Sequence, residues 1–170
     1  MIAIGIDPGS RWVGVAVVDL GLDLEDGLLA WHLWHRDRRA DPAALPPFGW
    51  LEEIAATVTG LRLEHPGALV AIEQADLPLP WVKGRTHDVH PREIGGLQRA
   101  HGYLVGRLRP VVQVPQRGQG NGKGPDLAYP AVLRRGIRGR WTKSDLEHVR
   151  SATDVARKAP QFARLQGAMP

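Results

Sequence analysis

Two short apolar runs that each end in a carboxylate constrain the fold of this chain more than any other feature. Ile2 to Asp7 and Ala68 to Glu73 have the length and composition of buried strands. A charged side chain at the mouth of a buried strand costs several kcal/mol unless its charge is compensated. A divalent cation is one such compensator, because Mg²⁺ prefers oxygen ligands and often binds one or two carboxylates. The two runs therefore predict central strands whose ends carry a candidate metal site.

The pattern around these runs predicts further strands and helices. Arg11 to Asp19 follows the first run after the turn Asp7-Pro8-Gly9-Ser10, which indicates a β-hairpin. Composition and spacing then mark a strand over 28–35, a helix over 50–64, the strand over 68–73, a helix over 91–108, a strand over 111–114 and a last helix to about residue 158. This order predicts an α/β fold with a five-stranded mixed sheet flanked by helices.

The predicted helices carry two further features. Four glycines lie in the 91–108 helix, and each weakens it by about 1 kcal/mol relative to alanine. They indicate close approach to another element or subunit, with a frayed helix as the alternative. Ser144 and Glu147 form a capping box, which predicts the start of the last helix. We expect a single domain over 1–160 and a C-terminal tail over 161–170.

The composition excludes several classes of protein. Hydrophobic residues make up 43% of the 170 residues, and no run approaches the roughly 20 apolar residues of a membrane span. The start, Met1 to Ile6, lacks the basic flank of a signal peptide. The chain has no cysteine, which removes disulfides, thiolate metal ligands and thiol nucleophiles. By elimination, we expect a cytoplasmic protein without membrane attachment.

Positive charge is concentrated in one segment. The whole chain carries +4, whereas residues 116–150 hold eight Lys or Arg against three Asp or Glu. Such a segment is typical of proteins that bind a polyanion, most often a nucleic acid. A solvated basic surface that aids solubility is the alternative, and composition does not separate the two.

The last helix supplies two more acids. Asp154 lies among small and apolar residues, and Glu147 precedes it by nearly two turns, on the same helix face as Ser151. Together with Asp7 and Glu73 they offer oxygen ligands from separate elements, as two-ion phosphodiester cleavage requires. Each acid also has a simpler role open to it, namely an Asx turn, an ion pair with a nearby arginine, or, for Glu147, the capping box alone.

Two segments resemble a known family. Ile4-Gly5-Ile6-Asp7-Pro8-Gly9-Ser10, with Gly14 after it, resembles the first catalytic motif of the RuvC-type Holliday-junction resolvases. Ala71-Ile72-Glu73-Gln74 is similar to the second catalytic segment of that family, and the 94–108 stretch is loosely similar to the helix that follows. Actin-like sugar kinases and YqgF-type RNA nucleases share the first motif, whereas the Ile-Glu-Gln segment favours the resolvases.

The resemblance implies a ribonuclease H-like fold, a homodimer and hydrolysis that depends on Mg²⁺. It implies two ions per site, with Mn²⁺ as a further possibility for the metal. By position, it implies that Asp7, Glu73 and Asp154 are the catalytic, metal-binding acids.

One position departs from the family pattern. The family usually has an acid or a histidine three residues before the last aspartate, where this chain has Ser151. Glu147 has the better helix-face geometry and is our fourth candidate catalytic and metal-binding residue, with His148 as the alternative. The departure also leaves open a protein that binds its substrate without cutting it.

Branched DNA is the partner that the resemblance implies, and Lys and Arg would hold its phosphates without reading sequence. Lys83 and Arg85 come soon after Glu73 and are expected beside the catalytic site. The other candidate DNA-binding residues are Arg117, Lys123, Arg134, Arg135 and Arg138. We therefore expect a structure-selective endonuclease that resolves Holliday junctions. A YqgF-like RNA-processing nuclease and a non-catalytic junction-binding module are the alternatives.

Overall fold

A five-stranded mixed sheet forms the centre of the protein. The computed structural model describes residues 1–36, 45–75, 91–116, 121–134 and 145–168. Within these ranges the strand order is β3-β2-β1-β4-β5, with β1–β2 and β2–β3 antiparallel and β1–β4 and β4–β5 parallel. The strands are β1 (Ile2–Pro8), β2 (Trp12–Asp19), β3 (Leu28–His35), β4 (Leu69–Glu73) and β5 (Val112–Val114). The prediction of an α/β fold with a five-stranded mixed sheet is confirmed.

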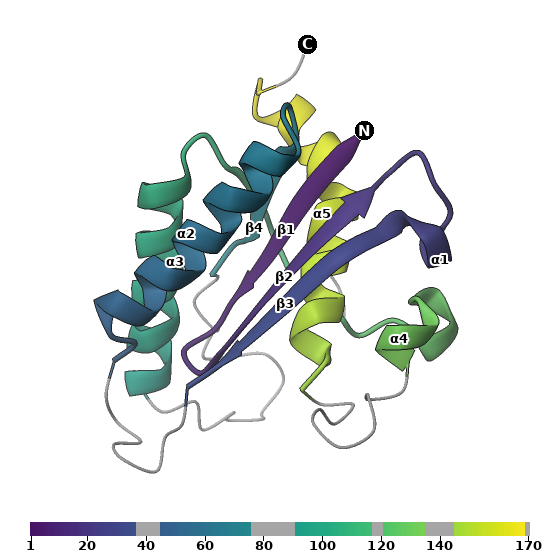
Figure 1. Cartoon of the computed structure of the whole chain (residues 1–170). Helices are drawn as coiled ribbons and strands as arrows, with labels where there is room; N and C mark the ends of the chain where they lie inside the picture. Colours follow the sequence, from purple (N-terminus) through teal and green to yellow (C-terminus); the bar gives the residue numbers. More distant parts are fainter. Residues whose placement is uncertain (37–44, 76–90, 117–120, 135–144, 169–170) are drawn as a thin grey trace.

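Helices cover both faces of the sheet (Figure 1). Helices α2 (Phe48–Glu64) and α3 (Pro91–Leu108) pack on one face, and α5 (Glu147–Leu165) packs on the other. Three short helical turns were not predicted from the sequence: α1 (Leu24–Gly27), η1 (Asp126–Ala128) and α4 (Ala131–Arg134). None of the helices in the described ranges has the length and hydropathy to cross a lipid bilayer.

Side chains alternate between the two faces along the central strands. Ile4 and Ile6 of β1 belong to the core under α2 and α3, whereas Ala3 belongs to the core under α5. In β4, Ile72 and Ala71 divide between the two cores in the same way. Because successive side chains of a strand point to opposite faces, Asp7 of β1 and Glu73 of β4 lie on the face that α5 covers.

Two glycines let the backbone of α5 lie directly against the sheet. A Cβ atom on Gly5 would lie 1.9 Å from the carbonyl oxygen of Ala152, and one on Gly14 would lie 2.3 Å from that of His148. Neither position has room for a side chain, because the obstructing atoms are backbone. The glycines of the first sequence motif therefore determine how close α5 approaches β1 and β2.

The ends of α5 differ from the sequence-based expectation. The capping-box prediction is wrong: the helix begins at Glu147, Leu146 takes the N-cap position without a side-chain cap, and Ser144 lies outside the described residues. The helix continues to Leu165 instead of ending near residue 158, because its apolar spacing continues and buries Phe162 against the sheet. The expected boundary at residue 160 thus falls inside this helix.

The glycines of α3 have unequal surroundings. A Cβ atom on Gly96 would lie 2.8 Å from the Cβ of Ser10, so this glycine allows close approach to the hairpin turn. Gly102 and Gly106 would meet nothing within 4 Å. The close approach that was predicted for this helix therefore occurs at Gly96, and the homodimer stays a prediction.

We expect Gly5→Ala to destabilise the protein by about 1–3 kcal/mol or more, because the added methyl group forces α5 away from the sheet. Gly60→Ala is the matched control, since a Cβ atom there meets nothing within 4 Å in the middle of α2. The control should be neutral or stabilising by up to about 1 kcal/mol. Urea unfolding of both variants measures the difference, and equal stabilities would contradict the close contact.

Candidate active site

Asp7 and Glu73 meet at the ends of two neighbouring parallel strands. The register pairs Ile6 of β1 with Ile72 of β4, so the next residue of each strand is one of the two acids. Both follow the alternation that turns them toward α5, and neighbouring strands lie about 4.8 Å apart. Asp7 is 8% exposed and Glu73 is 4% exposed. The sequence-based expectation that these two acids converge agrees with this geometry.

The two carboxylates repel each other in this buried setting. Burial raises the pKa of Glu73 to about 8, and the negative charge of Asp7 and a hydrogen bond with it act in the same direction. Hydrogen bonds from Asn121 and Gln116 oppose this rise. The pair therefore holds a proton at neutral pH unless a cation takes its place.

Each acid of the pair has partners from the α5 side of the sheet. Nδ1 of the His148 ring lies 2.9 Å from Oδ2 of Asp7. Glu73 accepts a 2.6 Å hydrogen bond from Nδ2 of Asn121 and a 3.3 Å hydrogen bond from Oγ of Ser151. Of the two groups expected to replace an acid at Ser151, His148 is the one that contacts the pair.

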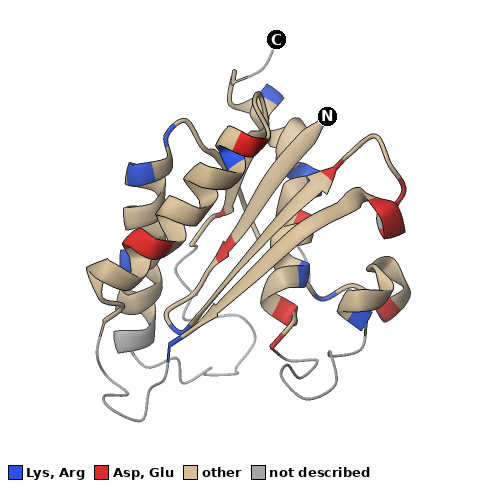
Figure 2. Cartoon of the chain, viewed as in Figure 1, with Lys and Arg blue, Asp and Glu red and all other residues tan. Residues whose placement is uncertain are grey.

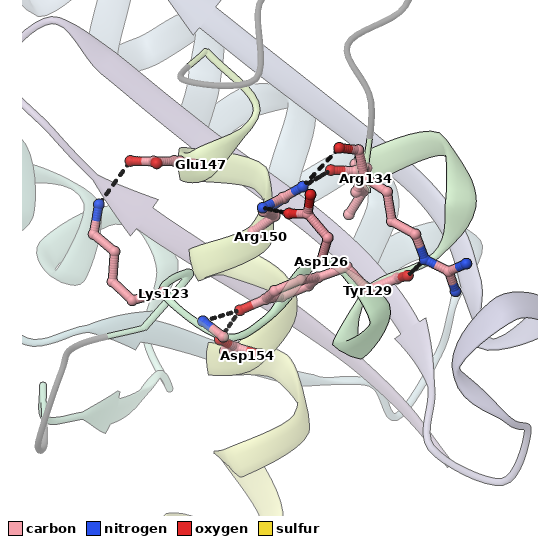
Figure 3. Close-up of polar contacts among 9 residues, drawn as sticks. Lys123, Asp126, Tyr129, Arg134, Glu147, Arg150 and Asp154 are labelled. Atoms are coloured by element: carbon pink, nitrogen blue, oxygen red, sulfur yellow. Dashed lines mark hydrogen bonds and ion pairs between the residues drawn. The ribbon is translucent and has the colours of Figure 1, made fainter.

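Glu147 is engaged with a neighbouring cation. Its carboxylate lies 2.6 Å from Nζ of Lys123, and both side chains are near half exposure, at 40% and 53% (Figure 3). This exposed pairing contributes little to stability. The sequence placed Glu147 and Ser151 on one helix face, but Ser151 contacts Glu73 whereas Glu147 contacts Lys123.

Asp154 is bonded to the segment that precedes α4. Its Oδ2 accepts a 2.8 Å hydrogen bond from the backbone N–H of Gly122. It also accepts a 2.8 Å hydrogen bond from the hydroxyl of Tyr129 (Figure 3). Burial, followed by the hydrogen bond with Asp154, raises the pKa of Tyr129 to about 12. The hydroxyl therefore stays protonated at neutral pH and is the donor of the hydrogen bond to Asp154. Arg150, an arginine close to Asp154 in the sequence, pairs instead with Asp126 at 3.0 Å.

The donor set determines what a metal ion could find here. Among the residues that the structure describes, no three Asp, Glu, His or Cys side chains gather closely enough to hold one ion. The Asp7–Glu73 pair nevertheless fits one divalent ion, because Mg²⁺ commonly uses one or two carboxylates and completes its shell with water and phosphate oxygens. Metal roles for Asp154 and Glu147, and a second ion, stay predictions.

The candidate DNA-binding residues are only partly within the described ranges. Lys123 pairs with Glu147, and Arg134 lies 3.1 Å from Glu25 and also donates to the carbonyl oxygen of Tyr129. Lys83, Arg85, Arg117, Arg135 and Arg138 lie outside the described residues. The Lys and Arg residues that are described are spread over helices on both sides of the sheet (Figure 2).

Asn121 and Arg150 are among the residues of this region that sequence reasoning missed. Asn121 lies inside a glycine-rich stretch, and nothing in that pattern marks it as a partner of Glu73. Arg150 is 2% exposed and donates to the carbonyl oxygen of Leu133 at 2.7 Å, so it ties α4 to α5. Its position among the buried residues of an amphipathic helix is the pattern that could have identified it.

Comparisons with known proteins identify the fold. No protein-family model matches the sequence, and no curated protein matches it. The structure is similar to RuvC of Thermus thermophilus in complex with a Holliday junction substrate, with 18% identity, a TM-score of 0.56 and coverage of 97% of this chain and 96% of that chain. A second T. thermophilus RuvC structure has 20% identity and a TM-score of 0.53, and covers 98% and 97%. The chain therefore has the ribonuclease H-like fold of RuvC, as the resemblance implied.

For the protein without metal, we expect the free energy of unfolding to fall as the pH rises from about 4.5 to about 8. The folded state binds the Glu73 proton more tightly than the unfolded chain does. The stabilisation from this proton is therefore complete below the Glu73 pKa of the unfolded chain, and it is lost as the pH rises through the pKa of the folded state. Glu73→Gln should flatten this part of the profile. Urea unfolding of both proteins at several pH values measures it, and parallel profiles would contradict the raised pKa.

Proposed function

We propose that this chain, which has the fold of RuvC, is an endonuclease that cuts branched DNA, in particular four-way junctions, with the help of divalent metal ions. The observation that carries the proposal is the buried Asp7–Glu73 pair at the ends of β1 and β4. Two buried acids that pair with no Lys or Arg of the described residues suit a metal ion that also binds a phosphate. The junction is proposed as substrate because one of the similar RuvC structures contains a Holliday junction substrate.

The residues of the site have distinct tasks in this proposal. Asp7 and Glu73 bind Mg²⁺ or Mn²⁺. When bound, the ion polarises the phosphate and lowers the pKa of the attacking water. His148 donates from Nδ1 to the Asp7 carboxylate, because a carboxylate only accepts, and so helps to orient it. A second ion requires Asp154 or Glu147 to exchange its present partner.

Several finer points belong to the same proposal. Lys83, Arg85, Arg117, Lys123, Arg134, Arg135 and Arg138 remain candidate phosphate contacts. A homodimer would place two such sites on two of the strands of one four-way junction. Location in the cytoplasm stays a prediction.

A non-catalytic junction-binding module is the second candidate, and Ser151 favours it. Ser151 donates to Glu73 at a point where a carboxylate would complete a three-acid cluster. Without that third acid, the site holds a metal ion with fewer charged ligands. Cleavage assays over a range of Mg²⁺ and Mn²⁺ concentrations separate the two candidates.

We expect Asp7→Asn to abolish cleavage of a synthetic four-way junction while it keeps or strengthens junction binding. A bound metal contributes several kcal/mol of transition-state stabilisation, so cleavage should fall by about a hundredfold or more. Binding should not weaken, because the change removes a negative charge that repels phosphates. Gel assays measure cleavage with Mg²⁺ and binding without it.

Two arms of this experiment test the alternatives. In the first arm, the parent protein is assayed with structured RNA as well as with the junction. Preferential cleavage of the RNA would favour a YqgF-like nuclease. Loss of junction binding with retained cleavage in Asp7→Asn would contradict the proposed role of this residue.

We expect Ser151→Asp to bind Mn²⁺ about tenfold more tightly and to cleave junctions faster than the parent. The new carboxylate would lie beside Glu73, whose oxygen is 3.3 Å from the present hydroxyl group. Ser151→Ala is the matched control and should not gain affinity. Calorimetric titration with Mn²⁺ measures this, and equal affinities of Ser151→Asp and the parent would show that residue 151 does not face the ion.

A further inference from the structure

A chain of hydrogen bonds connects Glu73 to a lysine on α5. Asn121 donates from Nδ2 to Oε1 of Glu73 at 2.6 Å, and Oδ1 of Asn121 accepts a hydrogen bond from Nζ of Lys158. Asn121 and Glu73 are 5% and 4% exposed. The Asn121 amide therefore bridges the ammonium group of Lys158 and the buried carboxylate of Glu73.

The chemistry of its two neighbours determines how the Asn121 amide is oriented. The ammonium group of Lys158 can only donate, so the amide oxygen must face it. The amide nitrogen then faces Glu73 and donates to it. Lys158 thus holds the Asn121 amide in the orientation in which its nitrogen donates to Glu73.

The backbone next to Asn121 is held against α5. Gly122 has φ +74, and a Cβ atom there would lie 2.7 Å from the carbonyl oxygen of Glu147 and 2.9 Å from the backbone nitrogen of Ser151. Its N–H donates to Asp154 at 2.8 Å. Only glycine fits this conformation and this contact. Asn121 is therefore placed by a fixed backbone, so its contact with Glu73 is built into the fold.

We propose that Asn121, backed by Lys158, is a positioning residue that orients Glu73 for metal binding in the candidate active site. This inference deepens the proposed function and rests on it. Asn121 holds one carboxylate oxygen of Glu73, which restricts how the carboxylate can turn toward an ion shared with Asp7. Groups of this kind, which orient a metal ligand without touching the metal, typically change affinity 10–100-fold when removed.

Mn²⁺ titration of the full chain without DNA tests the proposal. We expect Asn121→Ala to weaken Mn²⁺ binding by about 10- to 100-fold, and Lys158→Met to weaken it in the same direction by less. Lys158→Arg keeps a donor and should restore much of the affinity. Arg157→Met is the matched control, because it removes one exposed positive charge from the neighbouring position of α5. Thermal unfolding checks that each variant is folded. If Asn121→Ala does not fold, the Mn²⁺ affinity of Lys158→Met tests the proposal in its place.

Junction cleavage supplies a second readout. If Asn121 acts through metal binding, saturating Mn²⁺ should bring the cleavage rate of Asn121→Ala back toward that of the parent. Parent-like or tighter Mn²⁺ binding by Asn121→Ala and Lys158→Met would overturn the inference, and tighter binding would mean that Lys158 competes with the ion.

Asp7→Asn distinguishes the two levels of failure. If Asp7→Asn loses Mn²⁺ binding while Asn121→Ala binds like the parent, only the positioning role is wrong. If the parent itself binds no Mn²⁺, the metal-dependent function fails and the positioning role fails with it.

Discussion

The direct contact between the backbone of α5 and the sheet is the constraint on which the rest of this structure depends. Gly5 and Gly14 leave no side chain between α5 and strands β1 and β2, and the core on this side consists largely of alanine and valine. A larger residue at either glycine would hold the helix away. Because the helix lies so close, His148 reaches Asp7 and Ser151 reaches Glu73.

The electrostatics of the site follow from this packing. The sheet buries two acids side by side, α5 supplies them with His148 and Ser151, and the segment before η1 supplies the Asn121 amide. Among the described residues, no Arg or Lys pairs directly with either acid. A hydroxyl or amide donor orients a carboxylate without cancelling its charge. The negative charge of the pair is therefore left for a proton or a metal ion to compensate, which is consistent with the raised pKa of Glu73.

The segment over 121–134 links the acids of α5 to the rest of the site. Gly122 bonds to Asp154, and the buried Arg150 bonds to the carbonyl oxygen of Leu133. Tyr129 also bonds to Asp154, and Arg150 pairs with Asp126 (Figure 3). Removing the acceptors of the buried Arg150 would leave its charge unsatisfied, so these contacts hold the segment against α5. Asp154 thus has a structural task in addition to the metal role proposed for it.

The sequence by itself determined the order of the five strands and the three long helices, and it placed Asp7 and Glu73 at strand ends, because apolar periodicity is a local property. The meeting of the two acids also needs β1 and β4 to pair as parallel neighbours, which is a contact between distant segments. Only the tertiary structure decided the partners of each acid. Asn121, Lys158 and Tyr129 act across contacts between distant segments, and periodicity carries no information about which side chain of one element faces which of another. The start of α5 was decided in the same way, because Glu147 turns to Lys123 rather than capping its own helix.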